Sequence, residues 1–189
     1  MGKKILIGPG LGTEPLVQSN VISIIHKLKA ANLNVPLVID ADGLKLVAEH
    51  PGLIQDYRGP VYLTPNKREY ENLLSGSEVN AAYIKQGHPN LTVIVKGHED
   101  VIKNNQISLT CKEGNSWRRC GGQGDLVAGT LATFSRTSNP PNTPLHHDDL
   151  IPLPAFDKHK GQMGRICVIG GSVQYTGATF YASMSSLTA

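Results

Sequence analysis

Apolar residues along the first 134 positions follow two alternating periods, one typical of buried strands and the other of amphipathic helices. Four short apolar runs predict strands at residues 3–8, 35–40, 59–64 and 91–97. Between these runs apolar residues recur at helical spacing, which predicts helices after Thr13, at 42–50, at 66–74 and at 78–85. Thr13 and Asn66 are the expected N-cap residues of their helices.

Two further elements are expected before residue 134. Residues 100–111 contain two short apolar runs around an asparagine-rich turn, which predicts a hairpin. A glycine cluster then leads into a helical run at 126–134. Strands that alternate with helices imply right-handed crossovers, so we expect an α/β fold with a mostly parallel sheet and helices on both faces.

The pattern changes after residue 134. Residues 135–157 hold five prolines and show no periodicity, which predicts a linker. Residues 158–189 contain a further apolar strand at 164–171, then a turn and a helix. The sequence thus predicts a main part at 1–134, a linker, and a strand-turn-helix segment at the end.

Composition excludes several classes of protein. The chain has 189 residues, 17% of them charged, with a net charge of +3, and it shows no strong basic patch of the kind a nucleic-acid binder carries. No apolar run approaches the ~18–20 residues of a membrane span, and the first apolar run is too short for a signal peptide. Three cysteines without metal-site spacing favour a reducing compartment, so we expect a cytoplasmic protein.

The clearest candidate chemistry lies in the sequence GGQGD, at residues 121–125. Glycine lets a backbone approach a ligand closely, and the free N–H groups at the start of the following helix favour an anion such as a transferring phosphate. Asp125 then stands where a carboxylate could accept a proton from an attacking hydroxyl. The alternative, that Asp125 only caps the helix, stays open on spacing alone.

Other turns are expected to meet the same place. In open parallel sheets ligands lie outside the carboxyl ends of the strands, where residues 8–12, 40–44, 64–69 and 95–100 should gather. The first of these, GPGLG, lacks the third glycine of a dinucleotide fingerprint, and no GxxxxGK[ST] phosphate loop occurs. The cluster at residues 146–149, two histidines and two aspartates, lies in the proline-rich stretch and is interpreted as solvated, so no metal ligand is assigned.

Five ordered segments carry a resemblance to a known family: IGPGLG, VIDADGL, LTPNKREYENL, VIVKG and NSWRRCGGQGDLVAGTL. Together they resemble the ATP-dependent NAD(P)H-hydrate dehydratases of the ribokinase-like superfamily, from about residue 4 to 134. GGQGD resembles the eukaryotic form, since bacterial relatives more often have threonine in place of glutamine and use ADP. The resemblance implies a three-layer α/β/α fold.

The resemblance also implies a repair reaction. Hydration damages the nicotinamide ring of NADH or NADPH, and such an enzyme uses ATP with magnesium to phosphorylate the resulting hydroxyl. Phosphate then leaves and the dihydronicotinamide is restored. The implied partner is this small molecule, not a nucleic acid or a membrane. The sequence does not distinguish NADH-hydrate from NADPH-hydrate, and it leaves a homo-oligomer and a mitochondrial form open.

Site residues follow from the matching positions. Asp125 would be the catalytic base, and it would also contact the substrate. The residues expected on the ATP side are Lys96, Gly97, His98, Glu99, Asp100, Asn115, Ser116, Trp117, Arg118, Arg119, Cys120, Gly121, Gly122, Gln123 and Gly124. The residues expected to face the damaged cofactor are Gly10, Asn66, Lys67, Arg68, Glu69, Tyr70, Glu71, Asn72 and Ala178.

The last segment resembles the start of the same domain. Residues 158–182, KHKGQMGRICVIGGSVQYTGATFYA, resemble the strand-turn-helix that opens the family's catalytic domain. In the family this segment comes first, whereas here it follows the linker, and several of the family's strands and helices have no counterpart. We therefore expect an incomplete domain, explained by a rearranged gene model, by a tandem-copy junction or by a permutation, in that order.

Two alternatives remain open at the level of sequence. A small-molecule hydroxyl kinase of the ribokinase-like superfamily would share a glycine-rich loop that ends in aspartate, although IGPGLG together with HKGQ argues against it. An inactive fragment that only binds nucleotide is the other, because missing segments would expose sheet edges and apolar faces.

Overall fold

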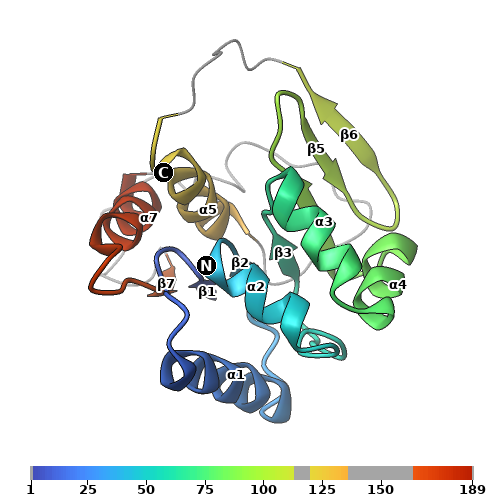
Figure 1. The fold of residues 1–189 in the computed structure, drawn as a ribbon, viewed down its shortest axis with the longest axis horizontal. Coiled ribbons are helices and arrows are strands. Elements are labelled where there is room, and N and C mark those ends of the chain that lie inside the picture. Colours follow the sequence, from blue (N-terminus) through green and yellow to red (C-terminus); the bar gives the residue numbers. More distant parts are fainter. Residues whose placement is uncertain (1, 113–119, 136–163, 189) are drawn as a thin grey trace, which may run out of the picture.

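The computed structural model describes residues 2–112, 120–135 and 164–188. They form a seven-stranded sheet of order β6-β5-β4-β3-β2-β1-β7 with helices on both sides (Figure 1). The predicted linker lies outside the described residues. The strands are β1 (Lys3–Ile7), β2 (Leu37–Ile39), β3 (Val61–Leu63), β4 (Leu91–Val95), β5 (Asp100–Lys103), β6 (Ser108–Cys111) and β7 (Arg165–Ile169). The predicted α/β class and the mostly parallel sheet are therefore confirmed.

Strand direction divides the sheet into two parts. β1 pairs in parallel with β2 and with β7, and the parallel pairing continues through β3 to β4. β5 and β6 form the predicted hairpin and continue the sheet in antiparallel fashion from β4. The carboxyl ends of the five parallel strands consequently lie along one edge of the sheet.

The helices are α1 (Pro15–Ala30), α2 (Asp42–Glu49), α3 (Lys67–Ser75), α4 (Glu78–Gln86), α5 (Gln123–Phe134) and α7 (Thr176–Thr188). Asn66 is the N-cap of α3, as predicted, and forms a capping box with Glu69. The prediction that Thr13 caps α1 is wrong, because the N-cap is Glu14 and no side chain caps that helix. Proline in the first turn fixes a helical φ angle and has no N–H group to be capped.

Two hydrophobic clusters cover the two faces of the sheet. Ile7 belongs to the larger cluster, with apolar residues of α1 to α4, while its neighbour Leu6 packs with α5 and α7 in the smaller one. Successive residues of a strand point to opposite faces, so a continuous apolar strand serves both clusters. Figure 1 shows the same division, with α1 to α4 on one side of the strands and α5 and α7 on the other.

The strand-turn-helix near the end of the chain completes the parallel part of the sheet. β7 pairs with all five residues of β1, from Lys3 to Ile7. α7 packs along α5, and Ala182 of α7 is fully buried there. The start of β1 also holds α5, because the buried Lys4 ammonium donates to the Thr133 carbonyl in the last turn of that helix. The two segments that resemble one domain therefore meet in one sheet.

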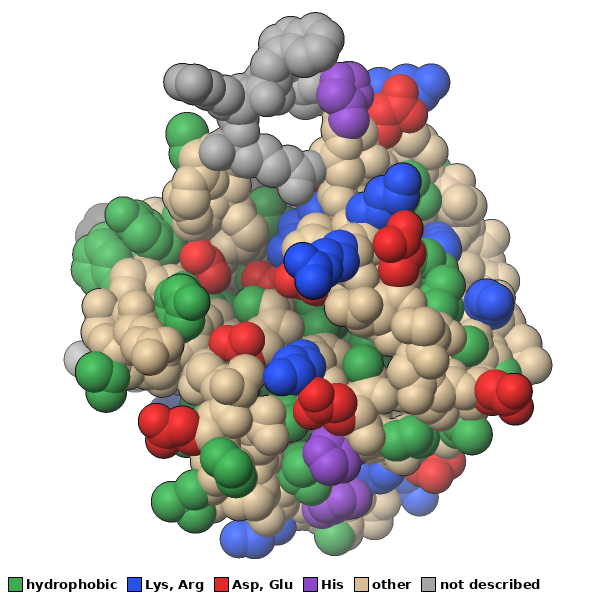
Figure 2. Space-filling model, viewed as in Figure 1, with side chains coloured by type: hydrophobic (Ala, Val, Ile, Leu, Met, Phe, Trp, Pro, Cys, Tyr) green, Lys and Arg blue, Asp and Glu red, His purple; other side chains and the backbone are tan. Residues whose placement is uncertain are grey.

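The outer face of α7 is exposed and apolar. Phe180, Tyr181, Met184 and Leu187 are all more than 40% exposed, and Figure 2 shows apolar side chains gathered over this helix at the left of the view. Only a narrow stripe with Ala182 packs fully against the rest of the molecule. Within the described ranges, no helix is long and apolar enough to cross a bilayer.

Candidate active site

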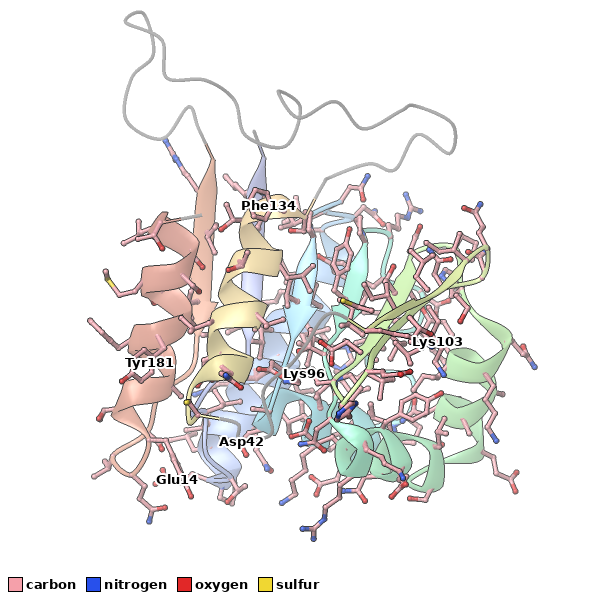
Figure 3. All side chains as sticks on the ribbon, turned by 90° about the horizontal axis from the view of Figure 1, so that it is seen from above. Glu14, Asp42, Lys96, Lys103, Phe134 and Tyr181 are labelled. Carbon is pink, nitrogen blue, oxygen red and sulfur yellow. The ribbon has the colours of Figure 1, made fainter. Side chains whose placement is uncertain are left out.

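The ends of four neighbouring parallel strands bring the predicted turns together. The GPGLG turn follows β1, Asp40 follows β2, Asn66 follows β3 and Lys96 follows β4. The backbone confirms that the last two are adjacent, because Lys96 N–H donates to the Pro65 carbonyl at 2.7 Å beside a parallel bridge from Asn66 to Lys96. In Figure 3, Asp42 and Lys96 lie toward the same end of the sheet, and Phe134 at the end of α5 lies at the opposite end.

A buried ion pair lies beneath these turns. Asp40 is 2% exposed, and its Oδ1 atom accepts from the Lys96 ammonium at 2.7 Å and from the Thr64 hydroxyl at 2.8 Å. Sequence reasoning placed the turn with Asp40 at this edge but did not assign the residue to the site. The sequence did carry a signal, because Asp40 directly follows a continuous apolar strand. A charged side chain at such a position is buried only when it has a partner, which indicates a buried polar site.

The start of α5 lies above this pair. Gly122 is the N-cap, with a left-handed φ of 85°, and no side chain caps the helix. The first amide groups of a helix have no acceptor within it, so those of α5 point toward the strand ends with the positive end of the helix dipole. A Cβ atom on Gly124 would lie 3.2 Å from the Lys96 ammonium and 3.9 Å from Asp40 Oδ2. The helix start and the lysine together place N–H donors around one space, an arrangement suited to phosphate.

Asp125 lies in the first turn of α5 and is partly exposed. Burial raises the pKa of its carboxyl group, the negative charge of Asp40 raises it further, and Lys96 lowers it. A carboxylate with a raised pKa is a stronger proton acceptor than a solvated one. The structure thus brings the predicted base together with two of the predicted phosphate-binding elements, Lys96 and the glycine loop.

The turn after β7 packs against the GPGLG turn. A Cβ atom on Gly10 would lie 2.5 Å from the Tyr175 carbonyl oxygen and 3.1 Å from the Ala178 methyl group. The contact is fixed by two bonds to the Pro9 carbonyl, which accepts from Gly171 N–H at 2.9 Å and from the Thr179 hydroxyl at 3.0 Å. Two residues predicted to face the substrate, Gly10 and Ala178, are therefore adjacent although 168 positions separate them.

The GPGLG turn also fits closely against the turn after β2. Gly8 has a φ of 124°, and a Cβ atom there would lie 1.7 Å from the Asp40 carbonyl oxygen. Asp42 completes the contact, because its carboxylate accepts from Gly12 N–H at 2.8 Å. Glycine at the first position is thus required by the approach of two backbones, not by a dinucleotide.

The seven residues predicted around α3 divide into three groups. Asn66 and Glu69 are occupied by the capping box, in which each side chain accepts from the other's backbone N–H. The remaining four polar side chains are exposed on the first turns of the helix, and these are Lys67, Arg68, Glu71 and Asn72.

Tyr70 points elsewhere. Its hydroxyl accepts from the Lys103 ammonium, which also lies 4.3 Å from the centre of its ring. Both residues line a cleft of about 150 Å³ between α4 and the hairpin. The structure therefore places the start of α3, but not the Tyr70 side chain, beside Lys96.

The loop from Lys96 to Asp100 is held by its own side chains. Asp100 accepts from Gly97 N–H at 2.8 Å, while Glu99 lies on the surface, 3.9 Å from Lys112. The predicted ATP-side residues Asn115, Ser116, Trp117, Arg118 and Arg119 lie outside the described residues. Cys120 and Gly121 are exposed at the entrance to α5, and Gln123 is exposed in its first turn.

Among the described residues, no group of three histidine, cysteine or acidic side chains could hold a metal ion. Of the two carboxylates near the start of α5, Asp40 is paired with Lys96, and Asp125 is close enough to feel both charges. Magnesium commonly keeps several waters and is bound largely through substrate phosphates.

Comparison with known proteins gives consistent matches. The family model described as NAD(P)H-hydrate dehydratase matches residues 3–144. Proteins named ATP-dependent (S)-NAD(P)H-hydrate dehydratase are 43% identical in Homo sapiens and 42% in Mus musculus, each over 140 residues, and 40% in Pediculus humanus subsp. corporis over 141. Each match covers 69% of this chain.

The chain spans only 40% to 46% of the length of these relatives. A solved structure, a hypothetical protein from Streptococcus mutans, is similar with a TM-score of 0.54 and 22% identity, covering 69% of this chain and 48% of that one. At this identity the likeness supports the fold alone. The segment that contains β7 and α7 lies beyond the residues matched by the family model.

Proposed function

The chain belongs to the NAD(P)H-hydrate dehydratase family, and we propose that its site restores hydrated NADH or NADPH in a reaction that consumes ATP. The position of Asp125 carries this proposal. It stands in the first turn of a glycine-capped helix, beside a lysine that can neutralise phosphate charge. The relatives bear the name of the ATP-dependent (S)-NAD(P)H-hydrate dehydratase, which supports this substrate class.

The N–H donors of the site suit the phosphates of ATP. The uncapped amides of α5 and the Lys96 ammonium face the same space above the strand ends. Donors fixed by the fold stabilise charge on a moving phosphoryl group without having to reorganise. A magnesium ion bound with ATP would supply further neutralisation of phosphate charge.

The first step is a phosphoryl transfer. Asp125 accepts the proton of the ring hydroxyl, the hydroxyl oxygen forms a bond to the γ-phosphorus, and the bond from that phosphorus to the β,γ-bridging oxygen breaks to release ADP. The raised pKa of Asp125 makes its carboxylate a better acceptor for that proton. In the second step the carbon–oxygen bond breaks, phosphate leaves with the bonding electrons, and loss of a ring proton restores the carbon–carbon double bond.

The substrate would lie between the start of α5 and the turn after β7. On this side Gly10 packs closely against Ala178, and Gly122 lies beside the Tyr181 ring. The start of α3 is exposed and lies beside the Lys96 turn, and it suits the charged parts of a dinucleotide. Preference for the NADH or the NADPH form would depend on contacts with the ribose phosphate.

The test is a product assay with hydrated NADH, ATP and magnesium. We expect inorganic phosphate and the near-ultraviolet absorbance of reduced nicotinamide to appear in equal amounts. A stable phosphorylated product without restored absorbance would assign the chain to the hydroxyl kinases instead. Absence of ATP consumption, together with no ATP-dependent rise in Tm, would reject both activities. A non-hydrolysable ATP analogue is the control, and it should raise Tm without supporting turnover.

A further inference from the structure

Asp40 is the most deeply buried charged residue of the site, and the family resemblance gave it no role. It follows β2 directly, and its backbone N–H donates to the Ile7 carbonyl at 3.0 Å, which fixes its position between two strands. Its Oδ1 atom accepts from Lys96 and Thr64, so the carboxylate is held from two further strand ends. Its Oδ2 atom is directed toward the start of α5, near Gly124.

Stability alone does not account for this arrangement. Withdrawing two charges from water is costly, and a buried ion pair often contributes no more to stability than apolar residues of similar volume. The surrounding strand ends are apolar, with Ile7, Ile39 and Leu63 all at most 1% exposed. An apolar pair in place of Asp40 and Lys96 would therefore suit the core equally well. The presence of a charged pair directly beneath the proposed phosphate-binding helix start instead indicates a functional constraint.

We propose that Asp40 is a positioning residue that holds the Lys96 ammonium beneath the start of α5, where the transferred phosphoryl group is bound. This inference rests on the proposed phosphoryl transfer. Lys96 has a long, flexible side chain that is 14% exposed, and without a fixed partner it would lose its orientation toward the helix amides. Because Thr64 orients Asp40, the Lys96 ammonium is held at one position beside Asp40 Oδ1.

The same carboxylate acts on the catalytic base through its charge. The negative charge of Asp40 opposes ionisation of Asp125 and thereby contributes to the raised pKa of Asp125, whereas Lys96 acts in the opposite direction. Replacing Asp40 by a neutral residue should lower the pKa of Asp125 for two reasons. The repulsion disappears, and the Lys96 charge is no longer balanced.

The other elements packed against α5 carry few groups that could have this effect. α7 contributes Tyr181, whose ring faces Gly122. β1 contributes Lys3 and Lys4, and Lys4 lies at the far end of α5, on the carbonyl of Thr133. Among the described residues, Asp40 and Lys96 are therefore the charged groups that shift the pKa of Asp125.

The test compares the Asp40→Asn variant with the unmodified chain. Asparagine keeps the size and the acceptor oxygen for Thr64 but removes the charge. We expect kcat/KM for ATP to fall about 10- to 100-fold, as loss of correct positioning commonly costs, and the acidic limb of the pH–rate profile to move to lower pH. The matched control is Asp56→Asn, and it should leave both quantities unchanged. Asp56 is exposed, and its neighbour Tyr57 bonds to Val35 ahead of β2, at the edge of the sheet opposite the site.

A second readout does not depend on turnover. The pKa of Asp125 is measured by NMR titration of side-chain carboxyl carbons, with the signal assigned by its loss in Asp125→Asn. A lower pKa of Asp125 in Asp40→Asn supports the inference, even if the chain proves to have no dehydratase activity and the proposed function fails. An unchanged pKa of Asp125 with unchanged kcat/KM overturns the inference while leaving the proposed function intact.

Thr64→Val covers the case in which Asp40→Asn does not fold. Valine matches threonine in shape, keeps both charges of the pair and removes only the hydroxyl that orients Asp40. We expect kcat/KM to fall about two- to tenfold, the equivalent of one lost hydrogen bond, with little change in the pKa of Asp125. A lower Tm with unchanged kcat/KM would show a merely structural role and would overturn the inference.

Discussion

Gly129 of α5 lies directly against Ala182 of α7, although 53 residues separate them in the sequence. A Cβ atom on Gly129 would lie 2.2 Å from the Ala182 carbonyl oxygen and 2.0 Å from the Ser185 hydroxyl. The two helices can approach this closely only because small residues line their contact. This contact joins the main part of the chain to the segment beyond the predicted linker.

Replacing Gly129 by alanine should therefore destabilise the protein. Alanine in place of glycine ordinarily stabilises a helix interior by about 1 kcal/mol, but here the added methyl group forces α5 and α7 apart, which costs about 1–3 kcal/mol. Chemical denaturation measures the free energy of unfolding. Gly177→Ala in α7 is the matched control, because its Cβ would meet nothing closer than 3.7 Å, and it should be neutral or slightly stabilising. Equal effects at both glycines would contradict the close packing of the helices.

Asp125→Asn should separate catalysis from folding. Turnover is expected to fall about 10²- to 10⁴-fold, the usual contribution of a general base, while the ATP-dependent rise in Tm is retained. The raised pKa of Asp125 means that the folded state disfavours its ionised form, so the variant should be more stable than the parent at neutral pH. That advantage should disappear as the pH falls below the ordinary value of 3.8. Unchanged turnover in the variant would refute the assignment of Asp125 as the base.

The two glycines before α5 should respond differently to alanine. Gly122 has a left-handed φ of 85°, and its Cβ would lie 3.1 Å from the Tyr181 ring. We expect Gly122→Ala to cost about 1–2 kcal/mol of stability through backbone strain and to weaken ATP binding, because the helix start is displaced. Gly121 has open space around it, so Gly121→Ala should change stability by less than about 0.5 kcal/mol. Thermal unfolding with and without ATP measures both effects.

Tyr57, which is buried, and Tyr83, which is partly buried with a buried hydroxyl, provide a matched pair. The Tyr57 hydroxyl donates to the Val35 carbonyl at 2.6 Å, whereas the buried Tyr83 hydroxyl has no partner among the described residues. Tyr57→Phe should therefore cost about 1 kcal/mol, and Tyr83→Phe should be neutral or stabilising. The same denaturation experiment at neutral pH measures both, and a larger cost for Tyr83→Phe would contradict the assigned bond.

The alkaline limit of stability should depend on the same tyrosines. Burial raises the pKa of Tyr57 and of Tyr83 to about 12, from an ordinary 10.0. As the pH rises, the two tyrosine hydroxyls lose their protons in the unfolded chain before they do so in the folded protein. The stability that the protonated hydroxyls contribute is therefore complete below pH 10 and is lost as the pH rises to about 12. Either phenylalanine variant should show a shallower loss of stability over this range. Loss of equal steepness in all three proteins would show that other groups govern the alkaline transition.

Most elements could be predicted from the sequence because their signals are local. The apolar runs of the strands, the capping pair of Asn66 and Glu69, and the glycine cluster before Asp125 each depend on neighbours within a few residues. The N-cap of α1 was misplaced for a local reason as well, because Pro15 sets the helix start without any capping side chain.

The site was only partly predictable. The candidate base and the candidate phosphate-binding glycines were predicted from one contiguous stretch, but the partners of Asp40 were not predicted. Thr64 and Lys96 stand 24 and 56 residues away, and only parallel pairing of β2, β3 and β4 brings these three side chains together. Sequence position carries no record of which strands will be neighbours.

The sequence by itself determined the order of strands and helices and the glycine-capped helix start that ends in a carboxylate. The tertiary structure alone decided that β7 joins the sheet beside β1, that Gly10 meets Ala178, and that a buried aspartate holds Lys96 beneath that helix. Local patterns depend on the period of one segment and on its caps. Long-range contacts depend on which faces pack and which strands pair, and those are settled only when the whole chain buries its apolar surface.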